Sequence, residues 1–291
     1  MATAAQWIEG ARPRTLPAAV SPVLAGTGVA AWSHDEVWWK AALALAVSLL
    51  LQVGVNYAND YSDGVRGTDD VRVGPLRLVG SKVATPAAVK RAAFVAFGLA
   101  AVVGLVLAAT TAWWLVAVGA VSILAAWYYT GGTRPYGYLG LGEVMVFVFF
   151  GLVAVLGTQY VQAEEITGDG VLAAVGVGAL ACAILVANNL RDIPTDTASG
   201  KRTLAVKLGD RTTRRLYAIL GAVAVVMLLR VAIGTDAWAL LGLLSLLPLL
   251  RATVTVVRGA SGPALIPVLQ LTGLSELLYA AGLFAGLLTA R

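Results

Sequence analysis

Two stretches of the chain carry acidic and amide side chains in a matching pattern. The first reads NYANDYSDG over residues 56–64, and the second reads NNLRDIPTD over residues 188–196. Each stretch places an Asn four residues before an Asp and adds a second Asp within one turn. Side chains three or four residues apart share one face of a helix, so each stretch presents an oxygen-rich edge.

Carboxylates that converge repel one another unless a cation lies between them. Oxygen ligands with open positions for phosphate oxygens favour magnesium, and the single His34 and single Cys182 provide no zinc cluster and no intramolecular disulfide. The alternative interpretation is that these acids are solvated loop residues. We predict a Mg²⁺ site formed by Asp60, Asp63, Asp192 and Asp196, with Asn56 and Asn188 as supporting oxygen donors.

Basic side chains accompany both acidic stretches. Acids and bases in one cavity suit a magnesium-bridged diphosphate, in which the metal binds some oxygens and Arg or Lys bind the others. The topology rule for basic loops also places such residues there, so each of them has that alternative explanation. The predicted diphosphate contacts are Lys201, Arg134 and Arg66, with Arg202 and Lys82 behind them.

Tyrosines crowd the same level of the chain. An aromatic belt at the membrane interface explains most of them, while a few ring faces can stabilise a carbocation. The candidates are Tyr57, Tyr61, Tyr128, Tyr129, Tyr136 and Tyr138, of which we assign Tyr129 to the substrate.

The elements that must position these residues are apolar helices. Of the 291 residues, 59% are hydrophobic and 13% are charged, and the mean hydropathy of +0.81 is that of a membrane protein. When the chain is divided at its polar, Gly-bearing and Pro-bearing interruptions, the apolar segments take up most of its length. They leave no room for a soluble domain, so we predict one transmembrane domain over 1–291. The nine predicted helices are 16–32, 38–58, 87–109, 112–130, 139–161, 170–190, 213–233, 237–257 and 264–289.

The basic residues predict the orientation. All but three of the 21, namely Lys40, Arg230 and Arg291, fall on the side of the N-terminus. The positive-inside rule therefore predicts that the N-terminus and the two motif-bearing loops, 59–86 and 191–212, are cytoplasmic. The net charge of +5 is explained by this topology, so no nucleic-acid partner is expected. No removable signal peptide is expected before the first span.

Four longer strings resemble the UbiA-type intramembrane prenyltransferases, in particular the 1,4-dihydroxy-2-naphthoate polyprenyltransferase branch of menaquinone synthesis. They are ARPRTLPAAVSPVLAGT, NYANDYSDGVRGTDD, YYTGGTRPYGYLGLGE and NNLRDIPTDTASGKRTLAVKLGD. The resemblance implies an all-α polytopic protein of the bacterial plasma membrane, with nine helices around a central cavity that opens to the cytoplasmic side. Where the broader family has a last Asp in its first motif, this chain has Gly67, and the next acids are Asp69 and Asp70.

The resemblance also implies the reaction. A polyprenyl diphosphate would be joined to 1,4-dihydroxy-2-naphthoate with loss of diphosphate and carbon dioxide, giving a demethylmenaquinone. Metal and cationic groups neutralise the leaving diphosphate, and a dry cavity protects the allylic cation from water. Arg14 is the expected partner of the naphthoate carboxylate, with Arg12 as its competitor, and interfacial anchoring is the alternative for both.

Other functions fit parts of the pattern. A related prenyltransferase acting on 4-hydroxybenzoate, homogentisate or haem would share these motifs, because ring choice depends on the shape of the pocket. A secondary transporter also combines many spans with a weak repeat, but its charges are expected near the bilayer midplane. The signature of CDP-alcohol phosphotransferases is not present. Glu143 is expected to form a structural hydrogen bond or to polarise a substrate hydroxyl, and Glu276 to join helices.

Overall fold

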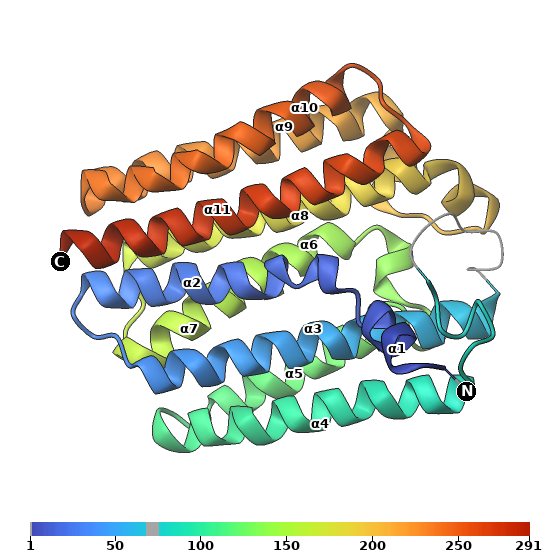
Figure 1. Ribbon diagram of the computed structural model, residues 1–291, viewed down its shortest axis with the longest axis horizontal. Helices are drawn as coiled ribbons and strands as arrows, with labels where there is room; N and C mark the ends of the chain where they lie inside the picture. The colour runs from blue at the N-terminus through green and yellow to red at the C-terminus, as the bar shows by residue number, and fades with distance from the viewer. Residues whose placement is uncertain (1, 68–75) are drawn as a thin grey trace.

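The computed structural model describes residues 2–67 and 76–291, which form helices aligned along one long axis (Figure 1). The described residues contain no strand, which confirms the predicted all-α class. The helices are α1 (Ala4–Gly10), α2 (Pro17–Trp32), α3 (Trp38–Arg66), α4 (Pro86–Thr110), α5 (Leu115–Tyr128), α6 (Gly142–Val146), α7 (Ala154–Ala163), α8 (Gly168–Ala198), α9 (Leu204–Gly234), α10 (Leu246–Val257) and α11 (Ile266–Ala290). Shorter turns or irregular helices are η1 (Pro13–Thr15), η2 (Tyr136–Leu139), η3 (Phe147–Val153), η4 (Ala237–Ser245) and η5 (Gly262–Leu265).

All nine predicted ranges overlap helices, but not every helix is long enough to cross a membrane by itself. Within the described residues, seven helical segments pass a test of length and hydropathy, and an eighth passes if the bent N-terminal pair is one span. The N-terminal pair is bent by 49°, and α5 has only 14 residues. A span needs about 20 residues at 1.5 Å per residue, so the count of nine spans is not reproduced although the chain is a multi-pass membrane protein.

The bend near the N-terminus has a local cause. Arg12 lies in the left-handed region, with φ of 56°, and it is followed by Pro13 in η1 and Pro17 at the start of α2. Proline fixes φ and cannot donate a backbone hydrogen bond, so the chain cannot continue as one α-helix through this stretch. The bend places Thr15 against α3, where it contributes to the site described below.

Close packing of α11 depends on two of its glycines. A Cβ atom at Gly286 would lie 2.1 Å from the carbonyl oxygen of Trp238, and one at Gly282 would lie 2.5 Å from the backbone nitrogen of Gly242. Small residues four apart allow helix backbones to approach in membranes, where dispersion replaces the hydrophobic effect as the packing force. The two glycines therefore allow the close contact of α11 with η4.

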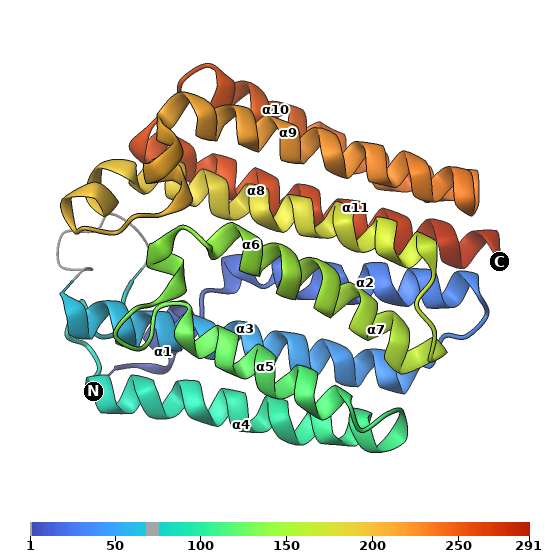
Figure 2. The same cartoon turned by 180° about the vertical axis from the view of Figure 1, so that it is seen from behind.

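Seen from behind, α5, α6 and α7 lie in front of α2 and α3 (Figure 2).

Both motif-bearing helices run further than predicted. α3 continues to Arg66 and ends at Gly67, with φ of 71°, while α8 continues to Ala198 before Gly200, with φ of 75°. Glycine adopts this left-handed conformation without a Cβ clash, so it ends helices readily. The motif acids therefore lie in the last turns of helices, at the same end of the molecule as the N-terminus (Figure 1).

Candidate active site

The ends of α3 and α8 meet through Lys201 and Asp63. The Nζ atom of Lys201 lies 3.5 Å from Oδ1 of Asp63, and it lies 4.5 Å from the centre of the Tyr138 ring. The Tyr138 hydroxyl donates to the same Asp63 oxygen at 2.5 Å. The two acidic stretches are thus brought to one face of the molecule, as their sequence positions predicted.

Lys201 is held in place at its backbone as well as at its side chain. Its N–H donates to the carbonyl oxygen of Asp196 at 2.8 Å. Burial lowers the pKa of the Lys201 ammonium, but the charges of Asp63 and Asp196 and the contact with Tyr138 outweigh it, so the net pKa is raised. The side chain is therefore a cation at neutral pH, enclosed between the two motifs.

Asp60 lies in the same motif as Asp63 but has different partners. It is 1% exposed, and its two carboxylate oxygens accept the backbone N–H groups of Leu78 at 2.7 Å and Val79 at 3.0 Å. Hydrogen bonds to a charged acceptor are the stronger kind, so this pair fastens the segment before α4 onto α3. Its predicted role as a magnesium ligand stays a prediction.

Asp192 is bound by its neighbour on α8. Arg191 donates to both of its carboxylate oxygens, from Nε at 2.6 Å and from Nη2 at 2.7 Å. The same Nη2 donates to Oδ1 of Asn188 at 2.9 Å, and Nδ2 of Asn188 lies 3.5 Å from Asp192. The second motif thus forms a compact group of acid, amide and guanidinium.

Asn56 turns its amide nitrogen toward the N-terminal bend. Nδ2 donates to the carbonyl oxygen of Ala11 at 2.9 Å and to Oγ1 of Thr15 at 3.0 Å. Of the two arginines in this bend, Arg14 is exposed, whereas Arg12 is half-buried and interacts electrostatically with Asp60. The structure therefore places Arg12, the competitor, nearer to the site than Arg14.

Four of the predicted diphosphate cations are exposed, and Arg66 differs from the other three in being anchored by hydrogen bonds. Arg66 donates to the backbone oxygens of Thr130 and Gly132, and its guanidinium lies 5.4 Å from the centre of the Tyr138 ring. The side chains of Lys82, Arg134 and Arg202 are exposed as well. The backbone N–H of Arg202 donates to the carbonyl oxygen of Tyr138 at 3.1 Å, which fixes the chain between α8 and α9 over the site.

The acids suit a hard cation, although they are not clustered. In the part of the chain that the structure describes, no group of three or more His, Cys, Asp or Glu side chains is close enough to hold a metal ion. Asp69 and Asp70 lie outside the described residues. Magnesium takes few direct protein ligands and keeps positions for water and substrate phosphates, so it does not need three carboxylates in one cluster, and single oxygens of the motif acids suit it.

A cavity of about 340 Å³ adjoins this site. Its wall is mainly apolar and is formed by residues of α2, α3, α4, α5, η2, α6, η3 and α7, with Gln52, Asn56 and Asn59 toward the motif end of α3. Asn59 accepts the Thr130 hydroxyl at 2.7 Å. Asn59 is the first residue of the NDxxD pattern, so the motif indicated a role in the site, but Asn59 was not among the predicted site residues. Nothing in the sequence around Gln52 indicated such a role.

Tyr129 is one of the tyrosines in the cavity wall, together with Tyr136. The two ring centres are 5.5 Å apart in an edge-to-face arrangement. Burial raises the pKa of the Tyr136 phenol, so it remains neutral, and its hydroxyl donates to the carbonyl oxygen of Ala125 at 2.7 Å. The pair thus presents aromatic surface to the cavity.

Two other acids lie within the bundle. Nδ2 of Asn189 donates to Oε1 of Glu143 at 2.9 Å, which is the structural hydrogen bond expected for that residue. Glu276 on α11 is fully buried, and neither of its carboxylate oxygens has a hydrogen-bond partner among the described residues.

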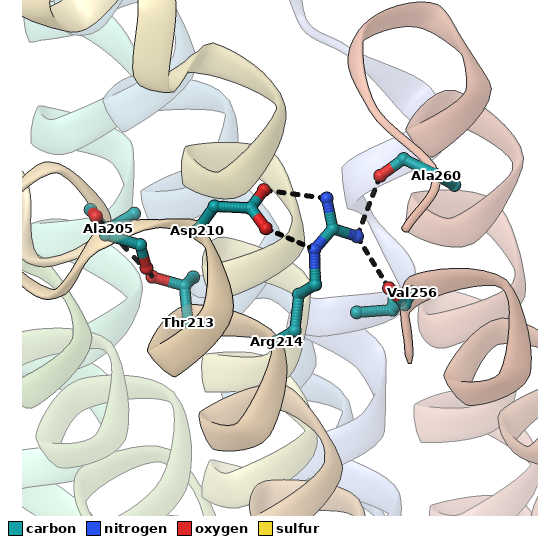
Figure 3. A network of polar contacts seen from close by, with 7 residues as sticks. Ala205, Asp210, Thr213, Arg214, Val256 and Ala260 are labelled. Carbon is teal, nitrogen blue, oxygen red and sulfur yellow. Dashed lines mark hydrogen bonds and ion pairs between the residues drawn. The ribbon is translucent and has the colours of Figure 1, made fainter. Parts of the chain in front are cut away.

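A separate polar network joins α9 to the loop after α10 (Figure 3). Arg214 donates to both carboxylate oxygens of Asp210 at 2.7 Å. It also donates to the carbonyl oxygens of Val256 at 2.6 Å and Ala260 at 2.9 Å. These bonds join α9 to the last turn of α10 and to the residues that follow it, so the network has a structural function.

The chain is similar to known proteins over most of its length. The family model described as the UbiA prenyltransferase family matches residues 19–287. A Mycobacterium tuberculosis protein named 1,4-dihydroxy-2-naphthoate octaprenyltransferase is 59% identical over 280 residues, covering 96% of each chain. An Escherichia coli protein with the same name is 38% identical, covering 96% of this chain and 94% of its own.

Solved structures share the fold at low identity. A UbiA homologue from Archaeoglobus fulgidus, solved bound to GPP and Mg²⁺, has a TM-score of 0.69 at 14% identity and covers 98% of this chain and 99% of its own. A homologue from Aeropyrum pernix has a TM-score of 0.74 at 15% identity and covers 92% of this chain and 97% of its own.

Proposed function

Because the chain belongs to the UbiA prenyltransferase family, we propose that it transfers a polyprenyl group from a polyprenyl diphosphate to 1,4-dihydroxy-2-naphthoate. The reaction releases diphosphate and carbon dioxide and gives a demethylmenaquinol, the reduced form of a demethylmenaquinone. The observation that carries the proposal is the contact of Asp63 with Lys201, because it joins two motifs far apart in the sequence beside an apolar cavity. The relatives with this activity in their names match nearly the whole chain.

The diphosphate binds where cations and acids meet. The Lys201 ammonium and the Arg66 guanidinium both lie over the Tyr138 ring, 4.5 Å and 5.4 Å from its centre, as fixed positive groups. The exposed side chains of Arg134, Arg202 and Lys82 add positive charge. Positive groups that are already in place stabilise the charge that develops on the leaving diphosphate, which favours cleavage of the allylic C–O bond. These side chains need little reorganisation, because Arg66 and Lys201 are already anchored.

The acids of the site would hold the metal. Asp63, Asp192 and Asp196 supply carboxylate oxygens, with Asn188 and Asn59 as neighbouring amide donors, and Asp60 and Asn56 complete the predicted set. Bound magnesium would neutralise part of the negative charge of the diphosphate. Asp60 also acts through its hold on the backbone of Leu78 and Val79, which closes the site on the side of α4.

The cavity accounts for the rest of the reaction. Its apolar wall receives the isoprenoid chain and excludes water, which would otherwise capture the allylic cation. The Tyr129 ring lies in this wall and can stabilise the cation through its π-face. The electron-rich ring then forms the C–C bond, and the ring carbon loses its proton while the carboxyl group leaves as carbon dioxide and is replaced by a proton. Arg12 and Arg14 are the candidates for binding the naphthoate carboxylate.

The protein lies in a bacterial plasma membrane with its N-terminus and both motif-bearing ends at the cytoplasmic side. The concentration of basic residues at that end supports this orientation. A cytoplasmic site suits the water-soluble naphthoate, and the bilayer supplies the polyprenyl diphosphate along the apolar helices.

The assay uses the purified full-length protein in lipid vesicles with MgCl₂, a polyprenyl diphosphate and separate aromatic acids. We expect a prenylated naphthoquinol with 1,4-dihydroxy-2-naphthoate, and loss of turnover when EDTA removes divalent ions. Readdition of Mg²⁺ should restore the product. Turnover of 4-hydroxybenzoate or homogentisate but not of dihydroxynaphthoate would overturn the proposed acceptor, and full turnover in EDTA would overturn the metal requirement.

A further inference from the structure

Gln52 is a polar residue of the cavity wall that the proposed mechanism does not use. It lies on α3, two turns before Asn59, and is 7% exposed. Most of its neighbours in the wall are apolar, so a buried amide here needs hydrogen-bond partners.

The hydrogen bonds of Thr15 determine how the Gln52 amide is oriented. The Thr15 hydroxyl donates its single proton to the carbonyl oxygen of Arg12 at 2.9 Å, so toward other groups its oxygen can only accept. It accepts from Nδ2 of Asn56 and from Nε2 of Gln52, each at 3.0 Å. Gln52 must therefore present its NH₂ group to Thr15.

The carbonyl oxygen of Gln52 is the atom of this amide that lacks a hydrogen bond among the described residues. Oε1 is buried and has no hydrogen-bond partner among the described residues. An unmade buried hydrogen bond is unfavourable, and a ligand that supplies a donor removes that cost. The site therefore favours a ligand that donates a hydrogen bond to the polar part of the cavity.

The two substrates of the proposed function differ in this respect. A polyprenyl diphosphate has an apolar chain and oxygen acceptors, and its ionised form has no donor. The dihydroxynaphthoate has two phenolic hydroxyl groups, each of which is a donor. A carbonyl that accepts a phenolic proton also increases electron density on the phenol oxygen, which makes the ring a better nucleophile.

We propose that Oε1 of Gln52 accepts a hydrogen bond from one ring hydroxyl of the aromatic substrate, and so selects and orients the acceptor ring in the cavity. Thr15 and Asn56 are positioning residues, because they fix the amide without needing to touch the ring. This inference rests on the proposed function and adds the residue that recognises the acceptor.

The first test is Gln52→Met, which keeps the length of the side chain and removes the acceptor atom. Steady-state kinetics in vesicles should show a KM for dihydroxynaphthoate about tenfold higher, because the hydroxyl is left unpaired, with the KM for the polyprenyl diphosphate within about twofold of wild type. Thr255→Ala is the control, since Thr255 lies on α10 outside the cavity and its hydroxyl donates to the carbonyl oxygen of Arg251 within that helix at 2.9 Å. Thermal unfolding in detergent checks that both variants fold.

The second test pairs the protein variant with substrate analogues. 1-Hydroxy-2-naphthoate and 4-hydroxy-2-naphthoate each lack one hydroxyl, and their inhibition constants are measured against wild type and Gln52→Met. The analogue that lacks the recognised hydroxyl should inhibit both proteins equally, while the other should inhibit the variant about tenfold more weakly.

The outcomes separate the two proposals. A folded Gln52→Met protein with wild-type KM for dihydroxynaphthoate would overturn the role of Gln52, as would equal losses with both analogues or an equal rise in the KM for the polyprenyl diphosphate. Absence of turnover of dihydroxynaphthoate by the wild-type protein would overturn the proposed function itself.

Discussion

The two Asn/Asp stretches share the spacing of four residues from Asn to the first Asp, but their acids have different partners. In the first, Asp60 accepts two backbone hydrogen bonds from the segment before α4, and Asp63 faces Lys201. In the second, Asp192 is held by Arg191, one residue earlier in the same helix. The comparison teaches that spacing identifies which residues share a face of a helix, whereas tertiary contacts decide whether a carboxylate fastens the fold or faces the substrate.

The most severe test of this difference is Asp63→Asn. The substitution keeps the shape of the side chain but removes the charge that faces Lys201 and a metal, so turnover should fall about a hundredfold or more. Product formation in vesicles at saturating substrates and Mg²⁺ measures the effect. Asp210→Asn is the matched control, because Asp210 is also paired with a cation but lies outside the site, and its turnover should be unchanged. Equal losses in the two variants would remove Asp63 from the site.

Asp60→Asn should have a smaller effect on turnover and a clear effect on stability. The new amide can accept one of the two backbone N–H groups, but its NH₂ faces the other, which costs about 1–3 kcal/mol. We expect a lower Tm, faster hydrogen exchange at the amides of Leu78 and Val79, and turnover reduced about tenfold through misplacement of the site. Wild-type exchange at both amides together with lost turnover would instead indicate that Asp60 acts directly on metal or substrate.

The sequence predicts which residues share a helix face, but it does not predict the tertiary contacts of those residues. The long apolar segments and the convergence of the two motifs were predictable, because helix length and hydropathy fix the spans and an even number of spans returns the chain to one side. The pairing of Asp60 with Leu78 and Val79 was not, because it depends on the folded path of a polar segment 18 residues away. Gln52 carried no signal, since a single amide in an apolar helix becomes informative only when Thr15 is seen beside it.

Arg214→Met should affect stability more than activity. Arg214 is largely buried and joins Asp210 to the carbonyl oxygens of Val256 and Ala260 (Figure 3). The Val256 carbonyl keeps the backbone N–H of Gly259 as a donor, so the loss of Arg214 removes the link to Asp210 and the bond to Ala260, at a cost of about 1–3 kcal/mol. Turnover of the folded protein should stay within about twofold of wild type, and the Tm in detergent should fall. A loss of turnover with an unchanged Tm would show that an Asp–Arg pair outside the two motifs also serves the reaction.

The smallest expected effect is that of pH on Lys201. Its pKa is raised in the folded protein, because the charges of Asp63 and Asp196 and the contact with Tyr138 outweigh burial, which alone lowers it. The ion pair with Asp63 therefore contributes fully to stability below the unfolded pKa of about 10.4, and this contribution is lost as the pH rises through the higher folded value. We expect no titration of Lys201 between pH 7 and about pH 10, measured by mass spectrometry as its rate of modification by an amine-reactive reagent. In Asp63→Asn, burial acts against a weaker opposing charge, so modification should begin at a lower pH than in wild type. The same onset of modification in both proteins would show that Asp63 is not what keeps Lys201 charged, and that the two motifs meet without being electrostatically coupled.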